Sequence, residues 1–263
     1  MYNNDAYSNE DFIDEMSHGK PTRKRTRASK QASGTIKPDV KPKFKEERQV
    51  PPLRPMNETQ AEYIEHIRTK KCIIATGYAG TSKTYIPTVM ACDKIRANEL
   101  KRLYLTRPNI SSSKSLGYFS GDHIQKMSMW LLPILTTMYE RLGKNIVDLM
   151  IKSGDIQFVP LETIKGMSFG KDTFVICDEA EDLTIDEVKS ILTRQGGCTM
   201  VLAGDLEQSA LKANSGLAFA KKMVEKHSEL SSYTGFVDFN RPSDIVRSTE
   251  CKAWLMAFRR EGV

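Results

Sequence analysis

Short apolar runs alternate with helical patterns along most of the chain. From residue 56 onward, the apolar runs are CIIAT (72–76), RLYLT (102–106), IQFVP (156–160), TFVICD (173–178) and TMVLAGD (199–205). Segments with helical periodicity lie before, between and after them, including about 58–70, a helix ending near 98 and an amphipathic stretch over about 123–142. Continuous apolar strands separated by helices are typical of a parallel sheet covered on both faces. The sequence therefore predicts an α/β fold with a mostly parallel sheet.

Three of the predicted strands end in polar or glycine-rich sequence. The first is followed by Gly77, the fourth by Asp178 and Glu179, and the fifth ends in Gly204 and Asp205. In open parallel sheets, ligands bind beyond the carboxyl ends of the strands. We therefore expect these three segments to meet in one binding site.

The first of these segments, GYAGTSKT (77–84), is one substitution away from a phosphate-binding loop. The pattern GxxxxGK[ST] has glycine where this chain has Ser82. Lys83 is predicted to reach the outer phosphates of a nucleotide, and Thr84 to ligate Mg²⁺. If position 82 needs a positive φ, serine there has a conformational cost. The loop residues predicted to bind the nucleotide are Gly77, Tyr78, Ala79, Gly80, Thr81, Ser82, Lys83 and Thr84.

The acidic strand ends supply the remaining candidate chemistry. Asp178 is predicted to hold Mg²⁺, and Glu179 to polarise the attacking water. Asp205 and Gln208 follow the next strand, where Gln208 can sense the γ-phosphate. For Asp178 and Glu179, the alternative is an acidic cluster at a helix N-terminus. For Asp205 and Gln208, the alternative is an ordinary strand-to-turn connection. Adjacent Asp and Glu favour hydrolysis over phosphoryl transfer to a small molecule.

Two flanking segments contain further candidates. Gln60 lies near a predicted helix start, and its amide can pair with the N6/N7 edge of adenine; the alternative is a surface residue. Arg247 is expected about one turn into a C-terminal helix, where it can act as an arginine finger on the γ-phosphate. A surface or salt-bridged arginine is the alternative.

Charge is concentrated in the N-terminal part of the chain. Residues 1–19 have five acidic residues and no Lys or Arg, whereas residues 20–48 have eleven Lys or Arg and three Asp or Glu. Residues 20–48 also have only one Phe, one Ile and one Val, too few apolar groups to offset the entropy of ordering them. We therefore predict a disordered tail and linker over 1–55, followed by an ATPase domain over 56–263. A basic tail suits binding to RNA or single-stranded DNA, although it can also be only solubilising.

The long loop 107–122 mixes basic and aromatic residues, which suit binding to single-stranded nucleic acid; an ordinary lid or subunit contact is the alternative.

Other classes of protein fit the sequence poorly. No window reaches 18 consecutive apolar residues, and the first residues do not resemble a secretory signal. Five cysteines without a CxxC pair are expected to be reduced thiols in a cytoplasm. The four histidines show no ligand spacing, so no zinc site is predicted.

Five motifs in consistent order resemble the PhoH family of P-loop ATPases. They are GYAGTSKT, RPNISSSKSLGYFSGD, FVICDEAEDLT, TRQGGCTMVLAGDLEQSAL and SGL (215–217), within residues 56–250. Ser82 and the short chain look most like the phage-encoded branch of that family. The resemblance implies a single RecA-like core that binds ATP and Mg²⁺, with Lys83, Glu179, Gln208 and Arg247 as catalytic residues. Some family members are associated with RNA unwinding.

One core of about 210 residues has a consequence for mechanism. Movement along a strand needs two such cores, so the sequence predicts a homo-oligomer, with a hexamer as the state that the family suggests. A ring or dimer would bring Arg247 of one subunit to its neighbour's nucleotide. The main hypothesis is ATP hydrolysis coupled to RNA or single-stranded DNA remodelling. The alternative is a nucleotide-gated nucleic-acid-binding protein with little hydrolysis, and a small-molecule kinase is disfavoured because no acceptor site is recognisable.

Overall fold

The structure, a computed structural model, describes residues 50–108 and 131–261 of the chain. These residues belong to one of two compact units, residues 42–263. Residues 1–49, for which disorder and nucleic-acid binding were predicted, lie outside the described residues. So do most of the loop predicted over 107–122 and the first part of the helix predicted over 123–142.

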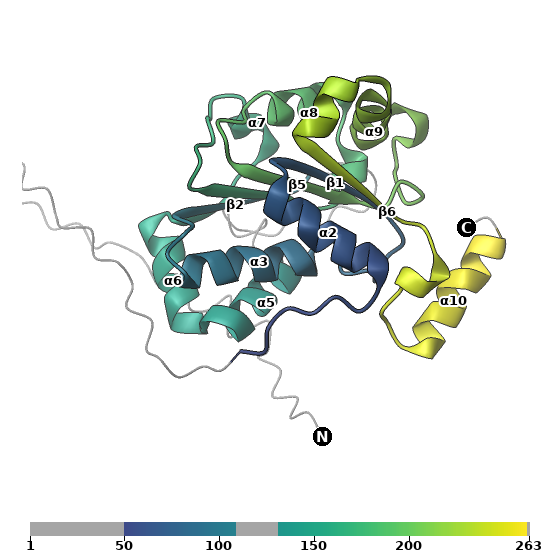
Figure 1. Ribbon diagram of the computed structural model, residues 1–263, viewed down its shortest axis with the longest axis horizontal. Coiled ribbons are helices and arrows are strands. Elements are labelled where there is room, and N and C mark those ends of the chain that lie inside the picture. The colour runs from purple at the N-terminus through teal and green to yellow at the C-terminus, as the bar shows by residue number, and fades with distance from the viewer. Residues whose placement is uncertain (1–49, 109–130, 262–263) are drawn as a thin grey trace, which may run out of the picture. The chain divides into compact units, whose positions relative to one another are not determined.

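A six-stranded sheet forms the centre of the described unit (Figure 1). Its strands are β1 (Cys72–Gly77), β2 (Arg102–Thr106), β3 (Ile156–Phe158), β4 (Thr173–Cys177), β5 (Thr199–Gly204) and β6 (Thr234–Phe239). Their order is β3-β2-β4-β5-β1-β6, and every described pairing is parallel. The prediction of an α/β fold with a parallel sheet is confirmed.

Helices cover both faces of this sheet (Figure 1). On one side lie α2 (Glu58–Thr69), α3 (Tyr85–Arg96), α5 (Leu132–Leu142) and α6 (Lys144–Ser153). On the other lie α7 (Leu161–Ile164), α8 (Ile185–Leu192) and α9 (Gly216–Lys226), and α10 (Thr249–Arg260) extends at the C-terminal end. Short 3₁₀ turns occur at Ala180–Asp182, Lys212–Asn214, Ser228–Ser232 and Pro242–Asp244. No described helix combines the length and apolar composition that crossing a membrane requires.

The position of each strand in the sheet explains its sequence. The residues of β4 are all buried, and β1 and β5 are buried except at one end, because helices cover both faces and a neighbouring strand lies on each side. The edge strand β6 instead alternates buried and partly exposed residues. A search for continuous apolar runs misses it because its sequence, TGFVDF, includes a glycine and an aspartate.

The core between the sheet and helices α7, α8 and α9 is apolar and includes three cysteines. Of the five cysteines, only Cys251 is partly exposed; Cys72, Cys92, Cys177 and Cys198 are buried. Burial raises the pKa of the Cys72 and Cys92 thiols to about 12. These cysteines are therefore structural thiols, as the sequence predicted.

The segment before α2 is attached to the domain by a buried arginine. Arg141 of α5 is 8% exposed and donates two hydrogen bonds to the carboxylate of Asp93 in α3, at 2.8 and 2.6 Å. Its third bond goes to the carbonyl oxygen of Pro51, at 2.6 Å. Pro51, within the linker predicted over 1–55, is therefore held against the α3–α5 pair.

Candidate active site

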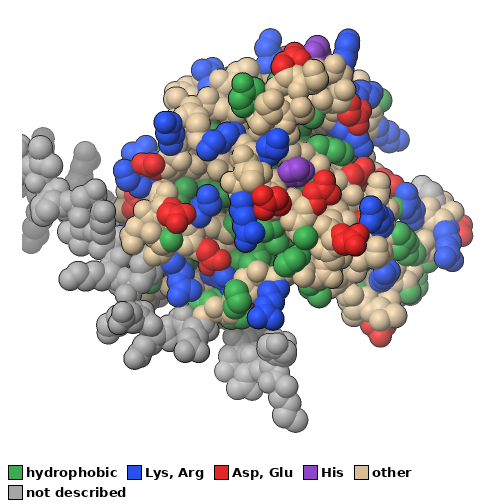
Figure 2. All heavy atoms as spheres, in the orientation of Figure 1, with side chains coloured by type: hydrophobic (Ala, Val, Ile, Leu, Met, Phe, Trp, Pro, Cys, Tyr) green, Lys and Arg blue, Asp and Glu red, His purple; other side chains and the backbone are tan. Residues whose placement is uncertain are grey.

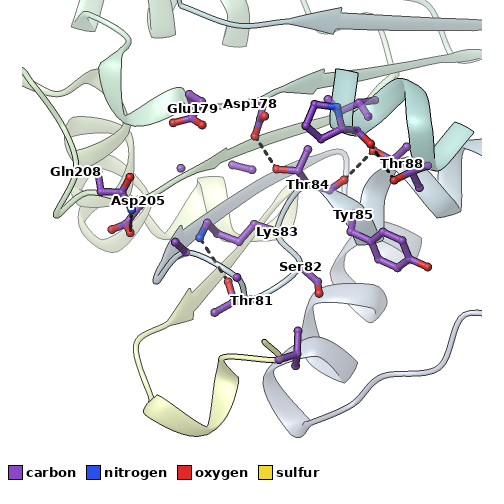
Figure 3. Close-up of a pocket in the computed structure, with 18 of the residues that line it drawn as sticks. Thr81, Ser82, Lys83, Thr84, Tyr85, Thr88, Asp178, Glu179, Asp205 and Gln208 are labelled. Atoms are coloured by element: carbon purple, nitrogen blue, oxygen red, sulfur yellow. Dashed lines mark hydrogen bonds between the residues drawn. The ribbon is translucent and has the colours of Figure 1, made fainter. Parts of the chain in front are cut away.

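A cavity of about 480 Å³ lies beyond the carboxyl ends of β1, β4 and β5. Figure 3 shows that the loop after β1 forms one wall and that the acidic residues after β4 and β5 face it. The three segments expected to meet are therefore in one site. The predicted site residues that line it are Ala79, Gly80, Thr81, Ser82, Lys83, Thr84, Asp178, Glu179, Asp205, Gln208 and Arg247.

The loop after β1 turns through left-handed backbone conformations. Gly77 has φ +119°, and a side chain there would collide with the backbone of Phe239 at the end of β6. Ser82, in the position where a P-loop has glycine, has φ +71°. This position does need a positive φ, so Ser82 is strained by its backbone conformation. The loop leads into α3, where Ile86 and Thr88 donate their N–H groups to the carbonyl oxygens of Ser82 and Thr84, at 3.1 and 3.3 Å, and Pro87 has no N–H.

Lys83 is directed back onto the loop that precedes it. Its ammonium group donates to the carbonyl oxygens of Gly77 and Tyr78, both at 2.6 Å, and lies 3.4 Å from the hydroxyl of Thr81. Burial lowers the pKa of Lys83, and nearby carboxylates, Asp205 foremost, oppose this shift. Gly77 and Tyr78 were predicted to bind nucleotide, but they do not line the cavity. Their carbonyl groups accept hydrogen bonds from Lys83, which does line the cavity.

Thr84 and Asp178 form the closest polar contact between the P-loop and the acidic strand ends. The threonine hydroxyl donates to the Asp178 carboxylate at 2.6 Å (Figure 3). Burial raises the pKa of Asp178, and the bond from Thr84 partly opposes this. No cluster of three or more His, Cys, Asp or Glu within the described ranges could enclose a metal ion. A hydroxyl and a carboxylate nevertheless fit Mg²⁺, which needs few protein ligands when phosphates and water supply the rest.

Two glutamates follow Asp178, and their environments differ. Glu179 lines the cavity with a left-handed backbone, φ +52°, and its carboxylate lies 3.5 Å from the Arg107 guanidinium. Glu181 also lines the cavity but is 2% exposed, and its Oε2 atom has no hydrogen-bond partner. Burial and a hydrogen bond with Glu179 raise the pKa of Glu181 to about 8. Of these two glutamates, Glu179 is therefore accessible to water and Glu181 is buried.

Asp205 and Gln208 are linked to each other after β5. The Gln208 amide donates to Asp205 at 2.9 Å, and the same carboxylate accepts the backbone N–H of Glu207 at 3.1 Å. Asp205 is 8% exposed, whereas Gln208 is exposed in the cavity. Asp205 therefore holds the Gln208 side chain at the cavity, and contact of Gln208 with a γ-phosphate stays a prediction.

Arg247 lies against the P-loop of its own chain. Its side chain occupies the space beside Gly80, and the neighbouring Val246 donates its backbone N–H to the Gly80 carbonyl at 3.0 Å. The expected position about one turn into a helix is wrong: Arg247 precedes α10, which begins after the N-cap Ser248. This arginine therefore reaches a site in its own chain and does not need a neighbouring subunit to do so.

The helix that follows Arg247 is also connected to the nucleotide site. Arg259 of α10 lies over the ring of Tyr78, 4.5 Å from its centre, and pairs with Glu207 at 3.2 Å. The Tyr78 ring is thus covered by α10, and its hydroxyl is buried without a hydrogen-bond partner. These contacts join α10 to both the P-loop and the loop that carries Gln208.

Gln60 is placed beneath the P-loop. It is 2% exposed; its amide nitrogen donates to the Thr81 carbonyl at 3.3 Å, and its oxygen accepts the N–H of Met56 at 2.9 Å. The side chain does not line the cavity, because both of its polar groups bind the backbone. Contact of Gln60 with an adenine edge stays a prediction.

Sequence reasoning did not assign two charged residues of this site. The buried Glu181 is third after Asp178 in DEAE, but whether its side chain enters the cavity depends on the 3₁₀ turn at Ala180–Asp182. Arg107 was assigned only to the loop 107–122, whose nucleic-acid binding stays a prediction, and its guanidinium contacts Glu179. Helix α5 also contributes Pro133, Ile134 and Thr137 to the cavity. Only the proximity of β2 to β4 in the sheet could have suggested the Arg107 contact.

We expect Ser82→Gly to stabilise the protein. Removing the Cβ relieves a left-handed strain of about 1–2 kcal/mol, and the extra chain entropy of glycine returns about 0.5–1 kcal/mol. The net increase in the free energy of unfolding is therefore about 0.5–1 kcal/mol, measurable by urea denaturation. Asn98→Gly is the matched control, since Asn98 has φ +58° but asparagine tolerates this conformation better. A Ser82→Gly protein less stable than the wild type would contradict the strain.

The raised pKa of Glu181 predicts a pH-dependent stability. Because its pKa rises from 4.5 to about 8 in the folded state, its stabilising effect is complete below pH 4.5 and is lost as pH rises through 8. Between pH 5 and 8, the wild type should lose about 2–4 kcal/mol relative to Glu181→Gln, which has no charge to bury. Urea denaturation without Mg²⁺ or nucleotide measures this, with the exposed Glu162→Gln as control. Parallel pH profiles for wild type and Glu181→Gln would contradict it.

Comparison with known proteins shows the same family over almost the whole described unit. The model of a family described as "PhoH-like protein" matches residues 52–259. Over 169 residues the chain is 34% identical to the PhoH-like protein of Bacillus subtilis (strain 168), covering 63% of this chain and 53% of that protein. Over 219 residues it is 30% identical to Protein PhoH of Escherichia coli (strain K12), covering 81% and 60%.

Solved structures that resemble part of the chain include a bacteriophage protein. The large terminase from a thermophilic bacteriophage aligns with 75% of this chain and 48% of its own, at 11% identity and a TM-score of 0.43. The matched regions span less than two thirds of both curated relatives. The family model nevertheless covers β1 to β6 and every cavity-lining residue described above. With its P-loop, acidic strand ends and parallel sheet, the chain belongs to the PhoH family.

Proposed function

We propose that this PhoH-family chain hydrolyses ATP in a Mg²⁺-dependent reaction. The observation that carries the proposal is the convergence of Lys83, the Thr84–Asp178 pair and Glu179 in one cavity. A nucleotide-binding protein without hydrolysis needs the first three residues, whereas Glu179 adds a group able to activate water. The composition of the cavity therefore favours an ATPase.

Each side chain has a part in that reaction. Lys83 exchanges its bonds to backbone carbonyls for bonds to the outer phosphates, and Gln208 and Arg247 contact the γ-phosphate from separate walls. Thr84 and Asp178 would hold Mg²⁺, which would neutralise charge on the phosphates. Glu179 orients the attacking water and accepts its proton.

The proposal includes RNA or single-stranded DNA as a partner. Its support is the excess of eight positive charges over residues 20–48, which can displace counterions from a phosphate backbone. On the face shown in Figure 2, Lys and Arg side chains of the described residues alternate with Asp and Glu. Residues 49–263 have 28 Lys or Arg and 25 Asp or Glu, so the excess of positive charge is concentrated in residues 20–48, and the tail is the part proposed to bind nucleic acid.

The proposal also includes a homo-oligomer, with a hexamer as the state the family suggests. Trp254 and Phe258 of α10 are 67% and 52% exposed and lie 5.7 Å apart between ring centres. No residue of α10 is buried, although the helix has an apolar side. An amphipathic helix gains most of its stability from burying that side, which contact with a second copy would achieve.

We expect wild-type protein to turn over ATP with Mg²⁺, and RNA or single-stranded DNA to stimulate the rate. Lys83→Ala and Glu179→Gln should each lower kcat by about 100-fold or more, since one removes a phosphate ligand and the other the base. Steady-state phosphate release measures this. The exposed residues Lys165 and Glu162 provide matched controls, Lys165→Ala and Glu162→Gln, which should retain wild-type rates.

Two outcomes would change the proposal. ATP binding without turnover in the wild type, abolished by Lys83→Ala, would favour a nucleotide-gated binding protein. Turnover that neither polymer stimulates, with or without residues 1–49, would remove nucleic acid from the proposal. Retained turnover in Glu179→Gln would assign the water-activating role to another residue.

The proposed oligomer predicts a concentration-dependent mass. At micromolar concentration with ATP and Mg²⁺, light scattering should give a multiple of the 29.7 kDa chain mass. Trp254→Ser combined with Phe258→Ser should shift the mass toward the monomer without unfolding the protein, because both side chains are exposed. The exposed Tyr233→Ser is the control for loss of an aromatic surface residue. A monomeric wild type would contradict the oligomer.

A further inference from the structure

The direction of the Glu179 carboxylate is not determined by regular secondary structure. Strand β4 ends at Cys177, and Glu179 has the left-handed backbone angles φ +52° and ψ +38°. The chain then enters the 3₁₀ turn at Ala180–Asp182. Its side chain is 37% exposed, so packing alone does not immobilise it. A water-activating carboxylate requires a defined position, which must come from neighbouring side chains.

Arg107 is placed to provide that position from the adjacent strand. Thr106, the last residue of β2, pairs with Cys177 of β4, and its carbonyl oxygen accepts the N–H of Asp178 at 3.0 Å. Arg107 is the next residue, so the sheet itself brings its side chain beside the acidic segment. Its Nη2 atom lies 3.5 Å from Oε1 of Glu179, and its side chain is 24% exposed. The guanidinium therefore approaches from a strand whose register is fixed.

Glu181 limits the movement of Glu179 from a second direction. The Glu181 side chain is packed against Gly204 of β5, where even a Cβ atom would collide with its carboxyl group. Glu179 therefore contacts both a closely packed carboxyl group and a cation tethered to β2. Two acidic groups in contact repel when both are ionised, and a neighbouring cation offsets that repulsion.

We propose that Arg107 is a positioning residue, which holds the Glu179 carboxylate toward the cavity so that it can orient the attacking water. This inference rests on the proposed ATPase function and adds a residue to its machinery. Arg107 does not line the cavity, in contrast to Lys83 and Arg247; its ion pair is with Glu179, and its charge also acts to lower the pKa of Asp178. The nucleotide is bound without it.

The test is the steady-state kinetics of Arg107→Ala. We expect kcat for ATP to fall about 10- to 100-fold, the cost of a misplaced catalytic group, while KM and the affinity for a fluorescent ATP analogue stay at wild-type values. Arg107→Lys should recover part of kcat, because an ammonium supplies the charge without the planar geometry. Arg102→Ala is the matched control: Arg102 is the exposed first residue of the same strand, and its loss should change nothing.

Chemical rescue separates positioning from a structural effect. Guanidinium at low millimolar concentration should raise kcat of Arg107→Ala and leave Glu179→Gln inactive, since only the first variant lacks the cation. Unfolding midpoints identify any variant that is destabilised, and Arg107→Gln then replaces alanine with a longer side chain.

The possible outcomes are distinct. An unchanged kcat in Arg107→Ala would overturn the inference while leaving the ATPase intact. A raised KM with unchanged kcat would also overturn it, because Arg107 would then bind nucleotide directly. If the wild type hydrolyses no ATP, the proposed function fails first and the inference fails with it.

Discussion

The contact between Thr84 and Asp178 depends on the whole sheet. These residues follow β1 and β4, which are not neighbours, because β5 lies between them. A hydrogen bond of 2.6 Å across that gap requires the P-loop to rise over the end of β5. The small residues Ala203 and Gly204 at that end line the cavity and leave the space for it. Strand order, loop conformation and the small residues of β5 are therefore one constraint.

That constraint concentrates carboxylates in a partly buried place. Asp178, Glu179, Glu181 and Asp205 come from the ends of two adjacent strands and act on one ammonium group, that of Lys83. Burial raises the pKa of Asp178 and Glu181, whereas Lys83 has its pKa lowered by the same cause. Burial therefore disfavours the charged form of the two carboxyl groups and of the lysine alike. A polyphosphate would supply negative charge to Lys83, and a divalent cation would supply positive charge to the carboxylates. The site is therefore suited to binding the two together.

Much of the fold could be predicted from the sequence, because parallel strands that are covered on both faces consist of consecutive apolar residues. Five strands were found in this way, and β6 was not, because a glycine and an aspartate interrupt its apolar residues in TGFVDF. Local signals also identified the P-loop and its acidic partners. The prediction about Arg247 was wrong in its helix position, because Ser248 is the N-cap and α10 starts only after it.

Contacts between distant segments could not be predicted in the same way. Neither the burial of Gln60 under Thr81 nor the pairing of Arg107 with Glu179 leaves a local pattern, because each joins residues far apart in the chain. The direction of Glu181 depends on a short turn that the sequence DEAE does not specify. These are the features that decide which polar groups enter the cavity.

The distribution of cysteines gives the protein a natural attachment point for a spectroscopic probe. Four thiols are enclosed in the core, whereas Cys251 is partly exposed near the start of α10, with its sulfur 3.8 Å from the Arg247 guanidinium. A maleimide dye should therefore react at one place without any engineered cysteine. Its fluorescence would follow the environment of Arg247, and thus the arrival of a ligand at the P-loop, in the native sequence.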